Sequence, residues 1–384
     1  MKKNILFKNL TKFYFSSEII LVISTILSLI IANSFLSEKF QFFLNEEIVS
    51  NISLKFIIDD FLMAIFFFLV GLELKKEIIL GELSNFNKAI TPVIAAFGGV
   101  IMPAIIFLLF NLNEKDNFKA FAIPCATDIA FAYAVVKSFG EKIPQFSRVF
   151  IVSLAVIDDL IAVVIIALFY TENFNIAYLF AILFVVILLF FINKAKTSIL
   201  PYNIFLWFVL WVILLRSSIH PAISGVIIAI FIPIKIGNKN YLENISHNIS
   251  PLVNLFIIPV FVFANSMVSI ENFSFSIFSN PLFLGIFFGL FIGKQLGVMI
   301  FCWPIYSFKN LNFSKSLYND IYSVAIFAGI GFTMSLFIAN LSLSDQGDIN
   351  IAKIAILLGS FASFIYGSFI VILKNKLLLK NRNL

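Results

Sequence analysis

Residues 153–164 read SLAVIDDLIAVV, and this stretch decides how the rest of the chain is interpreted. Two adjacent carboxylates, Asp158 and Asp159, stand between apolar residues on both sides. Ionised carboxylates are costly in apolar surroundings unless they are paired or neutralised. The stretch therefore raises the question of what compensates two neighbouring charges in such a place.

The composition indicates that these surroundings are a lipid bilayer. Of the 384 residues, 61% are hydrophobic and 12% are charged, which is more apolar surface than a soluble domain can bury. Apolar runs of about 20 residues, the length that spans a bilayer, recur along the whole chain. We therefore predict an all-α integral membrane protein. The formal net charge of +6 is interpreted as a topology signal and not as a nucleic-acid surface.

The apolar runs predict about twelve transmembrane helices in one membrane domain over residues 1–384, because no loop is long enough for a separate soluble domain. Residues 45–56, NEEIVSNISLKF, are too polar to span and predict an extramembrane hairpin within about 41–57. The predicted spans are 17–36, 58–80, 90–112, 119–138, 146–170, 175–193, 202–216, 219–236, 251–270, 281–305, 321–342 and 351–375.

Lysines and arginines in the short loops predict the orientation of the chain. With both termini in the cytoplasm, 20 of these residues lie on the cytoplasmic side and 6 on the other side. The remaining one, Lys294, lies inside the tenth span. The bias supports both the number of spans and the cytoplasmic location of the termini.

Charged side chains inside spans are rare, and by default they mark an ion site or a pathway. Adjacent residues on an α-helix point about 100° apart, so Asp158 and Asp159 cannot face one partner. We predict that one pairs with Lys294 while the other faces an aqueous cavity. The alternative is that these charges, with Asp128 of the fourth span, are only ion pairs between helices. Three aspartates against one lysine leave excess negative charge, which favours a site for a cation or protons.

Two spans contain residues that weaken helices. PCATD at residues 124–128 and AGIGFTMS at residues 328–335 place a proline, glycines and hydroxyl side chains inside the fourth and eleventh spans. Broken helices in corresponding halves of a transporter point to a substrate site between them. The glycines of the tenth span, Gly285, Gly289, Gly293 and Gly297, repeat every four residues and predict a close-packing stripe instead.

Seven segments, in order along the chain, resemble the NhaA family of sodium/proton antiporters, and the resemblance extends from about residue 10 to about residue 375. The segments are DDFLMAIFFFLVGLELKKE (59–77), IPCATDIAFA (123–132), LAVIDDLIAVVIIALFY (154–170), IHPAISGVIIAIFIP (219–233), FANSMVSI (263–270), GKQLG (293–297) and AGIGFTMSLFIANL (328–341).

The resemblance implies a twelve-helix antiporter of the bacterial inner membrane, with inverted repeats and two broken helices that cross near the bilayer midplane. It implies exchange of cytoplasmic Na⁺ or Li⁺ for external protons, electrogenic and switched on at alkaline pH. It implies a secondary transporter rather than an enzyme, with no cofactor. The hairpin segment fits the homodimer contact of that family.

Carried over residue by residue, the resemblance implies a transport site. Asp158 and Asp159 match the paired aspartates that bind Na⁺. Thr127 and Asp128 match the motif of the first broken helix, and Lys294 matches the lysine that pairs with the first aspartate.

A second group of residues matches positions tied to pH regulation: Asp60, Glu73, Glu77 and His220, with His247 as a cytoplasmic histidine near the same region. From the residues themselves, other readings stay open. Glu73 and Glu77 share a helix face at a spacing of four and also fit ordinary interface charges. A lone histidine such as His220 is more often a hydrogen-bonded structural residue than a sensor.

Three positions depart from the pattern of the family. Asp59 stands where asparagine is frequent, Gln295 replaces a usual proline, and Ser250 stands where a second loop histidine is common. These departures bear on the pH response more than on the transport reaction.

Other classes of membrane protein fit these residues less well. An intramembrane aspartyl protease would carry its aspartates on two helices, one of them in a Gly-x-Gly-Asp context. A prenyl-transferring enzyme would need carboxylate repeats that bind Mg²⁺ and diphosphate. A sodium-coupled organic-anion symporter is the nearest alternative, because it could share the broken-helix design.

Overall fold

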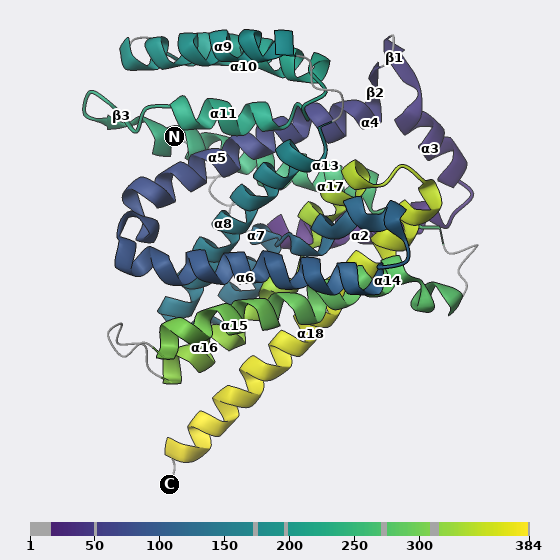
Figure 1. The fold of residues 1–384 in the computed structure, drawn as a ribbon, viewed down its shortest axis with the longest axis vertical. Coiled ribbons are helices and arrows are strands. Elements are labelled where there is room, and N and C mark those ends of the chain that lie inside the picture. Colours follow the sequence, from purple (N-terminus) through teal and green to yellow (C-terminus); the bar gives the residue numbers. More distant parts are fainter. Residues whose placement is uncertain are drawn as a thin grey trace, which may run out of the picture.

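The computed structural model describes residues 17–49, 52–171, 176–195, 199–269, 275–307 and 315–382, and these residues are mostly helical (Figure 1). The N-terminal lysines used for the orientation lie outside the described residues, as do Lys196, Lys309 and residues 50, 51, 175 and 270 of the predicted elements. The all-α fold predicted from the composition is confirmed.

Each predicted span corresponds to one helix or to two or three consecutive helical segments. They are α2 Ser17–Ala32, α5 Met63–Leu80, α6 Phe86–Phe110, η3 Lys115–Cys125 with α7 Ile129–Ser138, α8 Gln145–Phe169, α9 Ile176–Ala195, α10 Ile199–Arg216, α11 Ile223–Phe231, α12 Tyr241–Leu252 with η5 Val253–Ile257 and α13 Ile258–Asn265, α14 Pro281–Phe288 with η7 Gly289–Gly293 and α15 Lys294–Ser307, α16 Lys315–Ala325 with η9 Phe327–Gly329 and α17 Phe332–Ser342, and α18 Gln346–Arg382.

Short elements connect the long helices. They are α3 Ser37–Asn45, α4 Leu54–Phe56, the π-helix η1 Ile57–Leu62, the 3₁₀ turns η2 Glu82–Ser84, η4 Gly140–Lys142 and η6 Phe275–Ser279, and the strands β1 Glu47–Val49, β2 Ile52–Ser53, β3 Lys235–Ile236 and β4 Lys239–Asn240. Strand β1 pairs antiparallel with β2, so a hairpin lies where the polar segment predicted one. Its position outside the membrane stays a prediction.

The predicted number of spans depends on how bent helices are counted. In the described part of the chain, seven helices are long and apolar enough to cross a bilayer, and two bent pairs raise the number to nine. The other three predicted spans, 58–80, 202–216 and 219–236, are helical but shorter or more highly charged. Helix α5 carries four charged residues near its end, and α11 has nine residues because Pro221 and Pro233 bound it.

The first predicted span ends earlier than expected. Helix α2 stops at Ala32, and the chain turns by 111° into α3. The turn is closed by hydrogen bonds from the Asn33 and Ser34 N–H groups to the carbonyls of Ile30 and Ile31, at 3.3 and 3.2 Å. Residues 33–36 therefore belong to a corner and not to the span.

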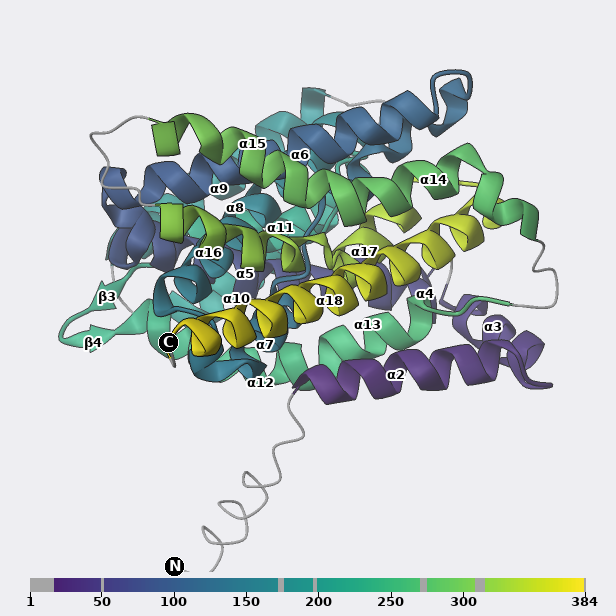
Figure 2. The same ribbon diagram turned by 90° about the horizontal axis from the view of Figure 1, so that it is seen from below.

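The glycine stripe of the tenth span packs as predicted. Helix α14–η7–α15 lies along α6, and both views show the two side by side (Figures 1 and 2). A Cβ atom built on Gly297 would lie 2.0 Å from the Gly98 carbonyl oxygen, and one on Gly293 would lie 2.8 Å from Pro103 Cα. Only residues without a side chain allow the two backbones to approach this closely.

The remaining helices surround the two broken spans. Helices α9 and α10 pair at one edge of the molecule, and the long α18 runs along the opposite side (Figure 1). Helix α2 lies beside α13 (Figure 2). The outer faces of α9 and α10 expose large apolar side chains such as Phe184 and Phe205. An apolar exterior of this kind fits contact with lipid acyl chains.

Candidate ion-binding site

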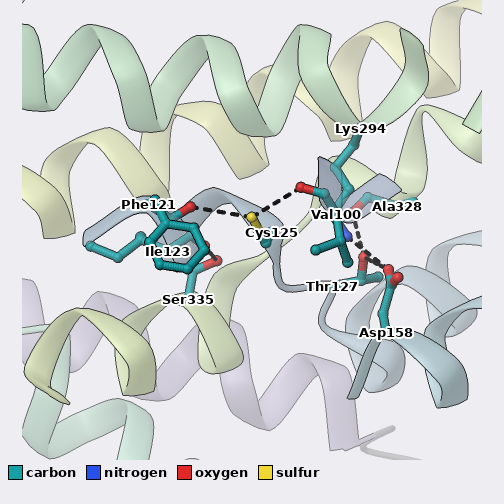
Figure 3. Close-up of polar contacts among 9 residues, drawn as sticks. All are labelled: Val100, Phe121, Ile123, Cys125, Thr127, Asp158, Lys294, Ala328 and Ser335. Atoms are coloured by element: carbon teal, nitrogen blue, oxygen red, sulfur yellow. Dashed lines mark hydrogen bonds and ion pairs between the residues drawn. The ribbon is translucent and has the colours of Figure 1, made fainter. Parts of the chain in front are cut away.

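The breaks of the two discontinuous spans lie against each other. The first break separates η3 from α7 at residues 126–128, and the second separates η9 from α17 at residues 330–331. The Asp128 N–H donates to the Ile330 carbonyl at 2.7 Å, and the Thr127 hydroxyl lies 2.8 Å from the Ala328 carbonyl oxygen (Figure 3). Backbone groups that a continuous helix would satisfy internally are therefore satisfied across the breaks.

Asp158 faces this crossing from the middle of α8. Its Oδ2 atom accepts a hydrogen bond from Lys294 Nζ at 2.7 Å and lies 2.8 Å from Thr127 Oγ1 (Figure 3). Asp158 and Lys294 have side chains that are 0% exposed. The pairing predicted from the sequence is thus present in the structure, and it involves the first aspartate. Asp158 Oδ1 has no hydrogen-bond partner within the described residues.

The Thr127 hydroxyl has two acceptors within reach but only one hydrogen. It can donate either to Asp158 Oδ2 or to the Ala328 carbonyl at any moment, since both lie at 2.8 Å. The hydroxyl can therefore leave the carboxylate without becoming unsatisfied. This suits a carboxylate whose charge changes when a proton or a cation arrives.

Asp159 points away from the ion pair into a cavity of about 430 Å³. The cavity also reaches Asp128, Thr333, Glu73 and Glu77. Asp159 is 2% exposed, and its Oδ1 atom has no partner among the described residues. The predicted division of roles between the two aspartates is the one that the helix geometry produces.

Asp128 occupies a different position from the other two aspartates. Its Oδ1 atom accepts the Phe131 N–H at 2.9 Å and so caps the N-terminus of α7. Its Oδ2 atom accepts the Thr333 N–H at 3.1 Å and the Thr333 hydroxyl at 2.5 Å, in the first turn of α17. One carboxylate therefore compensates the positive ends of two half-helices that converge on it.

The charges around the crossing do not balance with cations of the protein alone. Three buried aspartates and the nearby Glu73 face one buried ammonium, that of Lys294. The helix N-termini at Asp128 supply only partial positive charge. A bound cation or protons would complete the balance, and carboxylate and hydroxyl oxygens are ligands that hard cations prefer.

Glu73 and Glu77 line the same cavity as Asp159. Glu77 accepts hydrogen bonds from the Ser153 hydroxyl and from the Glu82 N–H, both at 3.1 Å. Glu77 also lines a second cavity of about 880 Å³. Arg148 lines this second cavity as well, and Tyr133 lines both cavities. The structure thus brings two of the predicted pH-regulating residues together with Asp159.

His220 and Asp60 lie elsewhere. His220 Nε2 is 3.3 Å from Asp60 Oδ1, and His220 Nδ1 accepts the Ala222 N–H at 3.3 Å. Asp60 precedes Glu73 by thirteen positions, about 20 Å along a helix axis. His247 lies exposed on α12, on a separate element from both groups. The predicted pH-regulating residues therefore form no single cluster.

Sequence reasoning left some contacts of the site unassigned. Thr333 was noted only as part of the helix break, yet it holds Asp128 with two donors. The Ala328 carbonyl and Ser153 were also missed as partners of Thr127 and Glu77. The AGIGFT stretch signals that α17 begins here, and a residue in the first turn of a helix is positioned to meet an anion.

The fold and the site together define a class: a multi-spanning helical membrane protein with buried carboxylates where two broken helices meet. The comparison with known families is more specific. The family model described as Na⁺/H⁺ antiporter 1 matches residues 8–371, and the chain belongs to this family. It is therefore an integral membrane transporter and not an enzyme.

Similar proteins cover almost the whole chain. The "Na(+)/H(+) antiporter NhaA" of Pelagibacter ubique is 41% identical over 376 residues, which cover 94% of this chain and 95% of that protein. The protein of the same name from Psychrobacter cryohalolentis is 40% identical over 92% of this chain and 91% of its own length. That of Salmonella arizonae is 39% identical, over 94% and 97% respectively.

Proposed function

We propose that the protein exchanges cytoplasmic Na⁺ or Li⁺ for external protons. The observation that carries the proposal is the asymmetric pair of aspartates in α8. Asp158 is neutralised by Lys294 at 2.7 Å, while Asp159 faces the cavity with an oxygen that has no partner in the described part of the chain. A carboxylate in this position is neutralised in turn by a proton or by a cation, which is what an exchanger requires.

Both aspartates take part in the proposed cycle. An arriving Na⁺ displaces the proton of Asp159 and binds its carboxylate in the cavity, and Asp158, whose Oδ1 has no partner among the described residues, reaches the ion only after its pairing with Lys294 loosens. Binding a cation weakens the attraction between Asp158 and Lys294, and an unpaired ammonium is unfavourable in a buried site. Lys294 then releases its proton. One Na⁺ would displace two protons in this way, one from Asp159 and one from Lys294, which makes the exchange electrogenic.

Thr127 and Asp128 have supporting roles in this proposal. Thr127 adds a hydroxyl oxygen beside Asp158, at 2.8 Å. Asp128 fixes the two half-helices to each other through Phe131 and Thr333, and it also lines the cavity that holds Asp159.

We further propose that Glu73 and Glu77, together with the separate pair of Asp60 and His220, regulate exchange by pH. Glu73 and Glu77 line the cavity that leads to Asp159, so their charge affects the entry of cations. His220 and Asp60 are 3.3 Å apart, and protonation of the histidine would turn this contact into an ion pair.

The setting of the protein follows from the same family. We propose a location in the bacterial inner membrane, with both termini in the cytoplasm and with the bilayer as the surrounding partner. The β1–β2 hairpin is proposed as a homodimer contact. Na⁺ and H⁺ are cargo, and the cycle is proposed to need no cofactor and to involve no nucleic acid.

A sodium-coupled organic-anion symporter fits the cavity less well. The walls carry Asp128, Asp159, Glu73 and Glu77 against the single cation of Lys76. An organic anion would be repelled from such walls, whereas Na⁺ and protons are attracted.

Everted membrane vesicles test the proposal. A ΔpH-reporting dye records whether Na⁺ added alone dissipates a respiration-generated pH gradient, across a series from acidic to alkaline buffer. We expect a response to Na⁺ in the parent and none in Asp159→Asn, with Glu114→Gln as a surface control of the same chemical change. A response that requires an organic solute, or the absence of any Na⁺ response at every pH, contradicts the proposal.

A further inference from the structure

Lys294 lies directly after a change of helix type. The π-helix η7 ends at Gly293 and α15 begins at Lys294. At such a transition the backbone hydrogen-bond ladder changes its spacing. The Gln295 side chain binds the backbone here, because Gln295 Nε2 donates to the Phe291 carbonyl at 2.5 Å.

The other end of the Gln295 side chain reaches the neighbouring helices. Gln295 Oε1 accepts from the Tyr322 hydroxyl of α16 at 3.3 Å. The Tyr322 and Tyr366 hydroxyls lie 3.1 Å apart, and the Tyr366 ring of α18 packs edge-on against the Phe291 ring at 5.8 Å. These four residues, Phe291, Gln295, Tyr322 and Tyr366, form a closed set of contacts that we call the Gln295 clasp.

The side chains of Lys294 and Gln295 point in different directions from the same helical turn. Successive residues on a helix differ by about 100°, so Lys294 turns toward Asp158 of α8 while Gln295 turns toward α16 and α18. Gln295 is 8% exposed, which means that its amide depends on these partners rather than on water.

The same broken helix contacts one neighbour of each member of the ion pair. Tyr322 of α16 holds Gln295, the neighbour of Lys294. Six positions further along the same span, the Ala328 carbonyl meets the hydroxyl of Thr127, which lies 2.8 Å from Asp158. A displacement of this span would therefore move the lysine through the clasp and the aspartate through Thr127.

We propose that Gln295 and Tyr322 are positioning residues for the exchange reaction: they hold Lys294 against Asp158 and transmit movement of α16 to the ion pair. The inference rests on the proposed function of Lys294 in exchange. Neither Gln295 nor Tyr322 lines the cavity at Asp159, so their effect on transport has to pass through the geometry of Lys294.

Three variants test the role of the clasp. Gln295→Met keeps the size of the side chain but removes both polar ends, and Tyr322→Phe removes one hydroxyl. Tyr318→Phe is the matched control, because the Tyr318 hydroxyl also joins α16 to α15, through the Met299 carbonyl at 3.0 Å, but does not touch Gln295. Each is compared with the parent in proteoliposomes for the half-saturating Na⁺ concentration and the pH profile, and in detergent for Tm.

We expect Gln295→Met and Tyr322→Phe each to change the half-saturating Na⁺ concentration about fivefold, the factor that one net hydrogen bond represents, and to displace the pH profile. The double variant should change little further, because both substitutions break the same contact. Tyr318→Phe should lower Tm by about as much as the two clasp variants do, and it should leave both transport parameters at the parent values. Parent-like transport in both clasp variants, or an equal change in Tyr318→Phe, overturns the proposal.

A second measurement does not depend on transport. In a double-mutant cycle on Tm, the effect of Gln295→Met should shrink in a Lys294→Gln background, since the clasp would no longer hold an ion pair in place. Additive effects would overturn the proposal even if the vesicles were inactive. Inactive parent vesicles would contradict the proposed function, whereas an active parent with additive effects contradicts only the clasp.

Discussion

Lys294 Nζ lies 2.7 Å from Asp158 Oδ2, and both side chains are withdrawn completely from the surface. This contact explains how the chain tolerates adjacent aspartates in an apolar helix. Asp158 is neutralised by a residue that lies far away in the sequence, and Asp159 is left to the cavity.

Lys294→Ala should destabilise the protein by about 3–5 kcal/mol, because it leaves Asp158 buried and unpaired. The loss should shrink as the pH falls, since a protonated Asp158 needs no cationic partner. Thermal unfolding in detergent across a pH series measures both effects. The double variant Asp158→Asn/Lys294→Gln should recover part of the loss, and a pH-independent loss would show that the lysine does not compensate Asp158.

Lys294→Gln separates the structural role of the lysine from proton transport. The variant keeps a donor but cannot titrate, so it should exchange fewer protons per Na⁺ and lose sensitivity to membrane potential. Reversal potentials in proteoliposomes give the stoichiometry. An unchanged stoichiometry together with a lowered Tm would restrict Lys294 to holding Asp158.

Asp159→Asn should abolish transport without lowering Tm. The substitution removes the charge of a carboxylate whose Oδ1 atom has no partner among the described residues. Asp159→Glu retains a carboxylate at an altered distance and should weaken Na⁺ affinity while transport persists. Isotopic Na⁺ uptake and Tm are measured for both variants. Normal turnover in Asp159→Asn would exclude a required carboxylate at this position.

Na⁺ and protons should compete for the aspartates of α8. A lower pH raises the fraction of protonated carboxylate, and a protonated carboxylate cannot bind Na⁺. The half-saturating Na⁺ concentration should therefore rise as the pH falls. Initial rates of exchange in proteoliposomes at several pH values measure it, and a half-saturating concentration that stays constant with pH would rule out competition.

The contact between α6 and α15 allows a test with two adjacent glycines. A Cβ atom on Gly98 would lie 2.2 Å from the Gly297 carbonyl oxygen, whereas one on Gly99 would meet its nearest atom at 3.5 Å. Gly98→Ala should destabilise the protein by about 1–3 kcal/mol or more through overpacking, and Gly99→Ala should have little effect. Tm values for the two variants decide, and equal values would contradict the close approach of these helices.

The sequence by itself determined the class of fold and most of the site. A chain that is 61% hydrophobic cannot bury its apolar surface in water, so the membrane helices follow from composition. The glycine spacing of α14–α15 and the breaks in the fourth and eleventh spans are local properties, and they were predicted because glycine and proline act on the backbone at their own positions. The rarity of charges inside spans singled out Asp128, Asp158, Asp159 and Lys294.

Only the tertiary structure decided which groups meet. The helix angle shows that Asp158 and Asp159 face apart, but it does not say which of them meets Lys294, 136 positions from Asp158. The use of Asp128 as a cap for α17 depends on a contact with Thr333, 205 positions away. The separation of His220 from Glu73 likewise depends on the contact between His220 and Asp60, which lies in η1 before the start of α5. Such contacts arise from packing between helices, and the energy of a buried charge depends on the partner that packing supplies.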